Sequence, residues 1–269
     1  METRMSRSRY DIGVRSCGQT IDMPDPDGQP VLALHARDGV LNVYKPPGLS
    51  SAQALYRVRG LTGIRRSGHA GALDPLADGV LLICLGRSTK LVERLMGLEK
   101  VYEATARLDV TNASFDAEQP FEPVEVARRP TPRQVAQAAS SFVGRIAQVP
   151  PDYSAVKVDG RPAYRLARRR RPLALRPRAV VIHALTVTGY RWPELSFTLR
   201  CGRGTYVRSL IRDWGRALGV GGCLTRLTRT RIGPFTLEDS LPLDAPEPLR
   251  VQRAFRTDQV VRSLFPGEA

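Results

Sequence analysis

A glycine-rich stretch, residues 68–79, places an aspartate where a charge is unusual, directly ahead of an apolar segment. Gly68 and Gly71 allow backbone conformations closed to other residues, and Pro75 disfavours helical backbone at Asp74, so a shaped loop is predicted. A carboxylate presented by such a loop can serve as a nucleophile, a general acid or base, or a metal ligand. A second interpretation is an Asx-turn, in which Asp74 bonds only to its own backbone.

A metal site at this loop would need further ligands, and the sequence offers few. The chain has only three histidines and four cysteines. The cysteines are far apart and form no Cys-x-x-Cys pair, unlike those of a zinc site. A metal site of His69, Asp74 and Asp78 is therefore disfavoured, and Asp78 is expected at the surface. Cys84 and Cys201 lie in apolar, strand-like segments and are expected to be buried free thiols.

The charge balance favours a polyanionic partner. Lysine and arginine number 41 against 26 aspartates and glutamates, which gives a formal net charge of +15. Nearly all of the positive charge is arginine, which pairs with phosphates and stacks on bases, so nucleic acid is favoured over a membrane surface. No segment has the pattern of a signal peptide or a membrane span, so a cytosolic protein is expected.

The elements that must position Asp74 predict an α+β fold. Strands and helices follow each other irregularly, which favours a mixed, largely antiparallel central sheet flanked by helices. Residues 1–38 predict an extended or partly disordered N-terminal extension, 39–240 one compact domain, and 241–269 a short C-terminal tail. The expected strands cover 40–44, 80–85, 101–108, 180–190, 195–200 and 224–232, and the expected helices begin at Ser50 or Ser51, Ser88, Thr131, Arg161 and Thr205.

The helix expected over 161–170 is strongly basic and carries Tyr164 among its arginines. Arginines continue to Arg171. Such a helix can grip the phosphates of a folded RNA arm. It can equally be a solvated helix face, and the sequence leaves both interpretations open.

Five motifs, in order along the chain, resemble those of the TruB family of tRNA pseudouridine synthases. They are Lys45–Ser51, the 68–79 loop, Lys100–Tyr102, Pro151–Lys157 and Gly204–Arg208. The resemblance covers approximately residues 39–240. It implies the pseudouridine synthase fold and an isomerase that converts uridine 55 in the T arm of tRNA to pseudouridine. No cofactor is implied, because the reaction changes no redox state.

The resemblance also implies catalytic roles for three residues. Asp74 matches the nucleophile, which attacks either C6 of the uracil or C1′ of the ribose; both routes stay open. Arg208 matches the cation that keeps this carboxylate ionised in a dry pocket. Tyr102 matches the ring that stacks on the target uracil, and a proton relay by its hydroxyl is disfavoured by the ordinary tyrosine pKa.

Four further residues are implied to bind or hold the RNA. His69 matches the side chain that fills the gap left by the flipped base. Lys45 matches a residue that holds the active-site loops, and Tyr206 and Leu224 match residues that line the pocket.

Some positions depart from the family pattern. Ala70 and Asp78 stand where many relatives have threonines, and residues 111–120 keep only part of the usual Thr/Asp/Gly pattern. The tail leaves no room for the additional RNA-binding domain of many bacterial relatives. A monomer that binds tRNA is expected. Two alternatives remain: a synthase for another stem-loop RNA, and a non-catalytic tRNA-binding or folding protein on the same scaffold.

Overall fold

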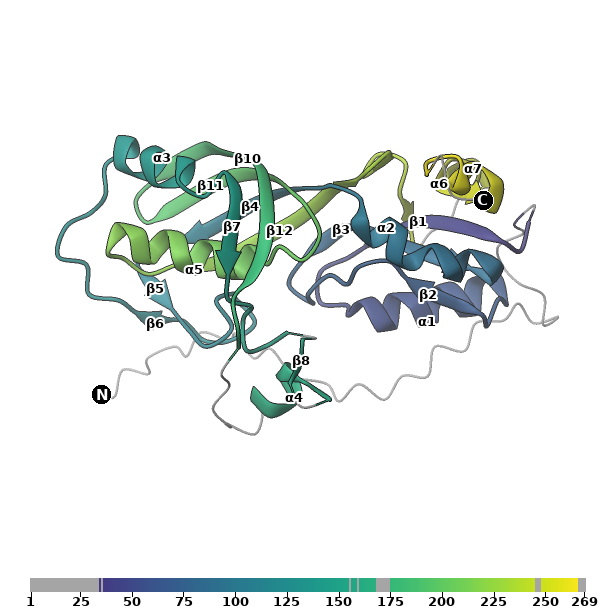
Figure 1. The fold of residues 1–269 in the computed structure, drawn as a ribbon, viewed down its shortest axis with the longest axis horizontal. Helices are drawn as coiled ribbons and strands as arrows, with labels where there is room; N and C mark the ends of the chain where they lie inside the picture. Colours follow the sequence, from purple (N-terminus) through teal and green to yellow (C-terminus); the bar gives the residue numbers. More distant parts are fainter. Residues whose placement is uncertain are drawn as a thin grey trace, which may run out of the picture.

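The computed structural model describes residues 34, 36–154, 156–158, 160–167, 175–244 and 248–265. In this part of the chain an 11-stranded sheet extends across the molecule, with helices packed on its faces (Figure 1). Its strands are β1 (Gly39–Lys45), β2 (Ser67–His69), β3 (Asp78–Leu85), β4 (Lys100–Arg107), β7 (Gly144–Gln148), β10 (Arg178–Arg191), β11 (Glu194–Cys201), β12 (Cys223–Ile232), β13 (Phe235–Thr236), β14 (Leu241–Pro242) and β15 (Phe255–Thr257).

Two small hairpins and the helices complete the described chain. The hairpins pair β5 (Val110–Thr111) with β6 (Glu122–Pro123), and β8 (Lys157–Val158) with β9 (Arg161–Pro162). The helices are α1 (Ser51–Thr62), the 3₁₀-helix η1 (Gly86–Leu91), α2 (Val92–Gly97), α3 (Pro132–Ser140), α4 (Ala163–Ala167), α5 (Val207–Leu218), α6 (Pro248–Ala254) and α7 (Asp258–Arg262).

The strand order confirms the mixed, largely antiparallel sheet. The order along its main path is β14-β1-β3-β12-β4-β11-β10-β7. Only the β1–β14 and β3–β12 pairs of this described sheet are parallel. Strand β12 therefore lies between β3, which follows the Asp74 loop, and β4, which begins with the Lys100–Tyr102 motif.

A close approach at the start of β3 fixes its position against β12. Gly79 has a φ of +104°, and a Cβ added to it would lie 2.2 Å from the Arg229 carbonyl oxygen. Only glycine tolerates this backbone conformation and this contact. The Asp74 loop therefore enters the sheet directly beside Arg229 of β12.

Helix α5 forms the main apolar layer under the site. Its residues Leu210, Ile211 and Trp214 are fully buried. Trp214 meets Phe197 of β11 edge to face at 5.4 Å, and its Nε1 donates a hydrogen bond to the Val135 carbonyl of α3 at 3.2 Å. Because α3, α5 and the sheet share one core, the N-terminal end of α5 is rigidly placed.

Helix α1 begins with a capping box. The Ser50 hydroxyl accepts the Gln53 N–H at 3.3 Å, and Gln53 Oε1 accepts the Ser50 N–H at 2.9 Å. The helix ends at Thr62 and is capped by Gly63, which adopts the left-handed φ of 65°. Buried Ala54 and Val58 join α1 to the core formed with β1 and β3.

Several expected elements differ in the structure. The segment from Ser88 forms η1 and then α2, and the Ser88 hydroxyl bonds the Asp258 carboxylate instead of capping a helix. The expected basic helix is described only as α4, five residues long, and the arginines at 168–171 lie outside the described residues. The expectation of buried free thiols at Cys84 and Cys201 is confirmed.

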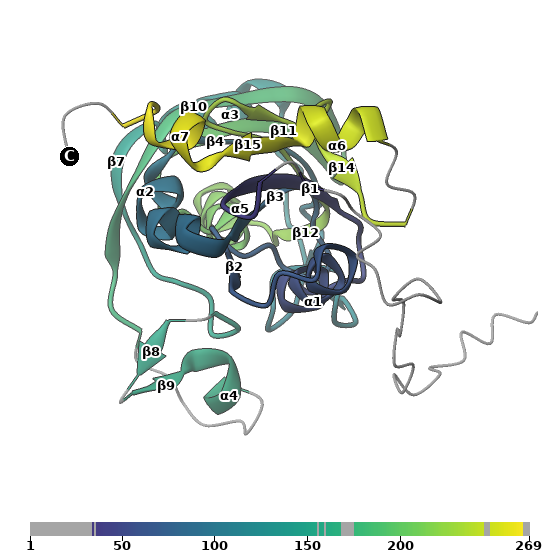
Figure 2. The same cartoon turned by 90° about the vertical axis from the view of Figure 1, so that its right-hand side faces the viewer.

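Residues beyond 240 pack against the sheet. Strands β14 and β15 both pair with β1, and the C-terminal helices gather along this edge, away from α1 (Figure 2). Leu241, Phe255 and Val261 are buried there. The boundaries at 38 and 240 stay predictions.

Candidate active site

Asp74 and Arg208 form an ion pair at the centre of the site. Arg208 Nε lies 2.8 Å from Asp74 Oδ2, and Arg208 Nη2 donates a hydrogen bond to Oδ1 at 2.9 Å. The Asp74 side chain is 39% exposed and that of Arg208 only 6%, so the carboxylate is reachable and its cation is shielded. Both Asp74 oxygens face Arg208, so the Asx-turn interpretation is wrong.

The backbone around the start of α5 is fixed by one buried amide. Gln148 Oε1 accepts the Tyr206 N–H at 2.8 Å, and Gln148 Nε2 donates to the Tyr206 carbonyl at 3.1 Å. Ser209 Oγ donates to the Val149 carbonyl at 2.8 Å. These bonds join α5 to the end of β7 and set the direction in which Arg208 leaves the helix.

A second carboxylate, Asp116, lies against the same guanidinium. Asp116 is 1% exposed, and its Oδ2 is 3.5 Å from Arg208 Nε. Its Oδ1 accepts hydrogen bonds from Ser114 Oγ at 2.6 Å and from the Glu118 N–H at 3.1 Å. Arg208 is thus shared by one exposed and one buried carboxylate, a geometry that holds its fork in a single orientation.

Two backbone carbonyls complete the environment of Arg208. Nη1 donates to the Ser114 carbonyl at 3.2 Å, and Nη2 to the Tyr153 carbonyl at 2.9 Å. Between Ser114 and Asp116, Phe115 adopts φ 58°, a left-handed conformation uncommon for a bulky residue. This strained turn presents the Ser114 carbonyl and the Asp116 carboxylate to the same arginine.

The loop that carries Asp74 is held from several sides. Ser51 Oγ accepts the Leu73 N–H at 2.8 Å and lies 3.1 Å from the Leu73 carbonyl. Glu118 Oε1 accepts the Leu76 N–H at 2.8 Å, and the Gly48 N–H donates to the Pro75 carbonyl at 2.8 Å. These bonds within the protein therefore fix the conformation of the loop before any ligand binds.

Lys45 is fully buried and closes the turn that follows β1. Its Nζ donates to the Pro46 carbonyl at 2.9 Å and to the Leu49 carbonyl at 2.6 Å. Burial lowers the pKa of Lys45 to about 8, although the nearby carboxylates of Asp78 and Asp74 act in the opposite direction. Lys45 therefore serves the structure of the turn and does not face solvent.

Tyr102 lies on β4, opposite Arg229 of β12, and only 8% of it is exposed. Burial raises the pKa of its hydroxyl, and the positive charge of the neighbouring Arg229 acts against that rise. A raised pKa leaves even less of the basic phenolate form near neutral pH, so a proton relay by this hydroxyl stays disfavoured.

His69 ends the short strand β2 and pairs with Ile83 of β3. Burial, followed by the positive charge of Arg229, lowers the pKa of its imidazole below 6.5. His69 is thus a neutral side chain at pH 7, suited to stacking among bases more than to binding a phosphate.

We expect the imidazole of His69 to titrate with a midpoint below 6.5, because both of these causes disfavour its charged form. NMR of the imidazole Cε1–H signals measures this, with the His69 signal assigned by its loss in His69→Gln. In the urea-unfolded chain the same signal should move up to about 6.5. A folded-state midpoint at or above the unfolded one would contradict the assignment.

The remaining candidates lie close by but differ in exposure. Tyr206 is half-buried, and burial raises the pKa of its hydroxyl. Leu224 is fully buried in the cluster that contains Leu73 and Tyr102, and its N–H donates to the Phe115 carbonyl at 2.9 Å. Leu224 therefore supports the 112–116 turn from the buried core. Its contact with a ligand stays a prediction.

Asp78 is not the surface residue expected from the sequence. It is half-buried, and its Oδ2 accepts a hydrogen bond from the Tyr44 hydroxyl at 3.1 Å. It is the first residue of β3, so of the two carboxylates in the 68–79 stretch only Asp74 pairs with Arg208. No three His, Cys, Asp or Glu residues in the described ranges are grouped so as to hold a metal ion.

Asp116 and Arg229 are site residues that the motifs did not reveal. Asp116 lies in the segment whose pattern is incomplete, and Arg229 is one of three arginines on β12 with no distinguishing spacing. In neither case does a local sequence signal mark the residue.

No helix among the described residues is long and apolar enough to cross a membrane.

Comparisons with known proteins point to one family. A family model described as "TruB family pseudouridylate synthase (N terminal domain)" matches residues 59–207. The tRNA pseudouridine synthase B of Burkholderia pseudomallei strain 668 is 45% identical over 215 residues, which cover 80% of this chain and 70% of that protein. The tRNA pseudouridine synthase B of Thermobifida fusca is 45% identical over 219 residues, covering 77% and 73%.

A solved structure of a Cbf5-Nop10-Gar1 complex contains a similar chain, with a TM-score of 0.64 and 28% identity. The match covers 86% of this chain and 63% of that one. The mixed sheet and the loop aspartate paired with a buried arginine, taken with these matches, define a pseudouridylate synthase. Within that class, the chain belongs to the TruB family.

Proposed function

We propose that this chain isomerises uridine to pseudouridine in tRNA, at position 55 in the T arm. The observation that carries the proposal is the Asp74–Arg208 pair, because the motifs that supply both residues are those of the family and the structure brings them within 2.8 Å. The relatives that match most of the chain are tRNA pseudouridine synthases, and the net charge of +15 suits an RNA substrate.

The reaction requires a nucleophile and a dry, shaped pocket. The bond between N1 and C1′ breaks, the uracil turns, C5 bonds to C1′, and the proton displaced from C5 leaves while N1 gains one. Atoms and redox state are unchanged, so no oxidant or reductant is consumed. Asp74 supplies the electron pair that attacks C6 or C1′, and this bond breaks again before the product leaves, which restores the free carboxylate. Arg208 holds that carboxylate in one orientation.

The other candidate residues take supporting roles in this proposal. Tyr102 offers its ring to the uracil, and neutral His69 fills the space that the flipped base leaves. Lys45 holds the turn next to the catalytic loop, and Tyr206 and Leu224 shape the pocket near Arg208. A monomer in the cytosol remains the expectation from the sequence.

The test is a modification assay with the wild-type chain. Unmodified tRNA is incubated with the protein, pseudouridine is converted to a bulky chemical adduct, and primer extension maps the stops. We expect one stop, at uridine 55. A stop at another uridine would support the stem-loop alternative, and tRNA binding without any stop would support the non-catalytic alternative.

A further inference from the structure

Arg229 is a buried cation beneath the Asp74 loop that the motifs leave without a role. Only 2% of the residue is exposed. Its guanidinium donates from Nε to the Val80 carbonyl at 2.8 Å, from Nη2 to the Gly71 carbonyl at 3.0 Å, and from Nη1 to the Ala72 carbonyl at 3.4 Å. All three nitrogens are thus directed at backbone oxygens.

These oxygens lie on both arms of the catalytic loop. Gly71 and Ala72 precede Asp74, and Val80 follows it in β3. One side chain therefore fixes the separation of the two arms, from inside the protein. The polar groups named earlier, Ser51 and Glu118, hold the same loop only between the arms, at Leu73 and Leu76.

The same guanidinium also reaches the other side of the site. Arg229 lies opposite Tyr102 in the β12–β4 register, and its positive charge acts on the Tyr102 hydroxyl. The side chain that bonds the nucleophile's loop therefore belongs to the residue opposite the ring expected to stack on the uracil.

The burial of Arg229 costs free energy of folding, which favours a functional role for this residue. Burying a cation is unfavourable unless it is paired, and no described carboxylate forms an ion pair with Arg229. The positive charge of Arg229 also disfavours the protonated forms of Lys45, Lys100 and His69, and so contributes to the lowered pKa of each. An apolar side chain would avoid both costs if only packing mattered.

We propose that Arg229 is a positioning residue for the reaction: it sets the distance and orientation of Asp74 relative to Tyr102, because it bonds both arms of the loop from a strand that is paired with the strand of Tyr102. The inference rests on the proposed function. Lysine cannot replace the fork, since a single ammonium at the end of a flexible chain cannot address three carbonyls in fixed directions.

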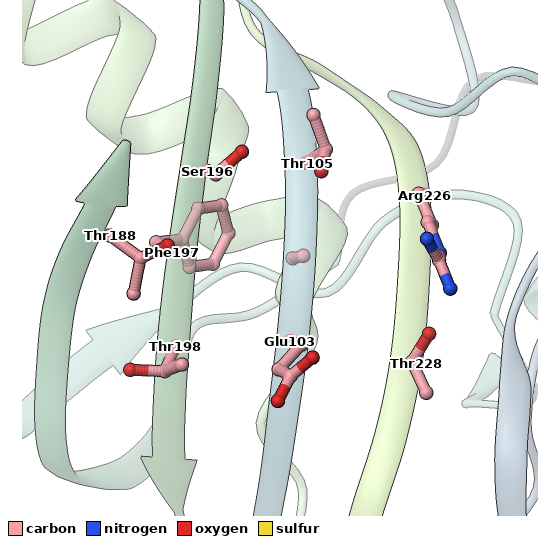
Figure 3. Close-up of a pocket in the computed structure, with 9 residues that line it drawn as sticks. Glu103, Thr105, Thr188, Ser196, Phe197, Thr198, Arg226 and Thr228 are labelled. Atoms are coloured by element: carbon pink, nitrogen blue, oxygen red, sulfur yellow. The ribbon is translucent and has the colours of Figure 1, made fainter. Parts of the chain in front are cut away.

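A matched control exists on the same strand. Arg226 is exposed, and it lines a hollow of about 310 Å³ on the outer face of the sheet, with Glu103 and Thr228 (Figure 3). It makes no hydrogen bond to the Asp74 loop among the described residues. Replacing Arg226 therefore removes the same charge from β12 without touching the loop.

The experiment compares wild type, Arg229→Gln, Arg229→Lys and Arg226→Gln in single-turnover pseudouridine formation, with tRNA affinity by filter binding and folding by thermal melting. We expect the rate constant to fall about 100-fold in Arg229→Gln and about 10-fold in Arg229→Lys, because small misplacements of reacting groups cost rates of this order. Affinity for tRNA should stay within about threefold, and Arg226→Gln should match wild type.

The rate constant separates positioning from a purely structural role. A destabilised but correctly arranged enzyme loses amplitude, since fewer molecules are folded, while its rate constant is kept. An unchanged rate constant in Arg229→Gln, or one that falls only in step with tRNA affinity, overturns the inference. If Arg229→Gln does not fold, Arg229→Lys decides in the same way. A wild type without product overturns the proposed function and this inference with it.

Discussion

Asp74→Asn is expected to abolish pseudouridine formation on tRNA, with a loss in rate of at least ~10⁴-fold, as removal of a nucleophile does in other enzymes. The amide is nearly the same size as the carboxylate and can still accept a hydrogen bond from Arg208, so the loop should keep its shape. What the variant lacks is the charged oxygen that attacks. Single-turnover incubation with unmodified tRNA, mapped by adduct and primer extension, measures the change.

Asp78→Asn is the matched control, because it removes the other carboxylate of the 68–79 stretch. Asp78 bonds Tyr44 and not Arg208, so we expect the rate to stay within about threefold of wild type. The affinity of Asp74→Asn for tRNA should remain similar to that of wild type. Equal product from Asp74→Asn and wild type would remove Asp74 from the role of nucleophile.

The sequence predicts the Asp74 loop well because its signals are local. Glycines and Pro75 restrict the backbone, and the apolar run that follows can only be a buried strand or helix segment. Asp74 and Arg208 are 134 residues apart in the sequence, and their pairing is predicted only because both residues lie in motifs of one family. Residue spacing alone would have left Arg208 a solvated helix residue.

Asp116 and Arg229 escaped prediction for a different physical reason. Arg226, Arg229 and Arg231 look alike in sequence, and bulges on either side of Arg229 in the β12–β4 register help determine which arginine is buried. Such bulges have no reliable sequence mark. Asp116 owes its place to the left-handed turn at Phe115, which few rules would assign to a phenylalanine.

Arg208→Lys is expected to slow pseudouridine formation about 100-fold while tRNA affinity changes little, because lysine keeps the charge but loses the fork. In the wild type the guanidinium serves both Asp74 oxygens and the carbonyls of Ser114 and Tyr153. One ammonium cannot serve these partners together, so Asp74 should become mobile. Arg216→Lys, an exposed position farther along α5, is the control and should behave as wild type.

Arg208→Met tests the second carboxylate. It leaves Asp116, which is 1% exposed, without its cation, and breaking a buried pair in this way costs about 3–5 kcal/mol of stability. Adding Asp116→Asn removes the stranded charge, so the double variant should regain most of the lost melting temperature. It should not regain activity, because Asp74 still has no partner. Recovery of activity along with stability would show that Arg208 serves the fold and not the nucleophile.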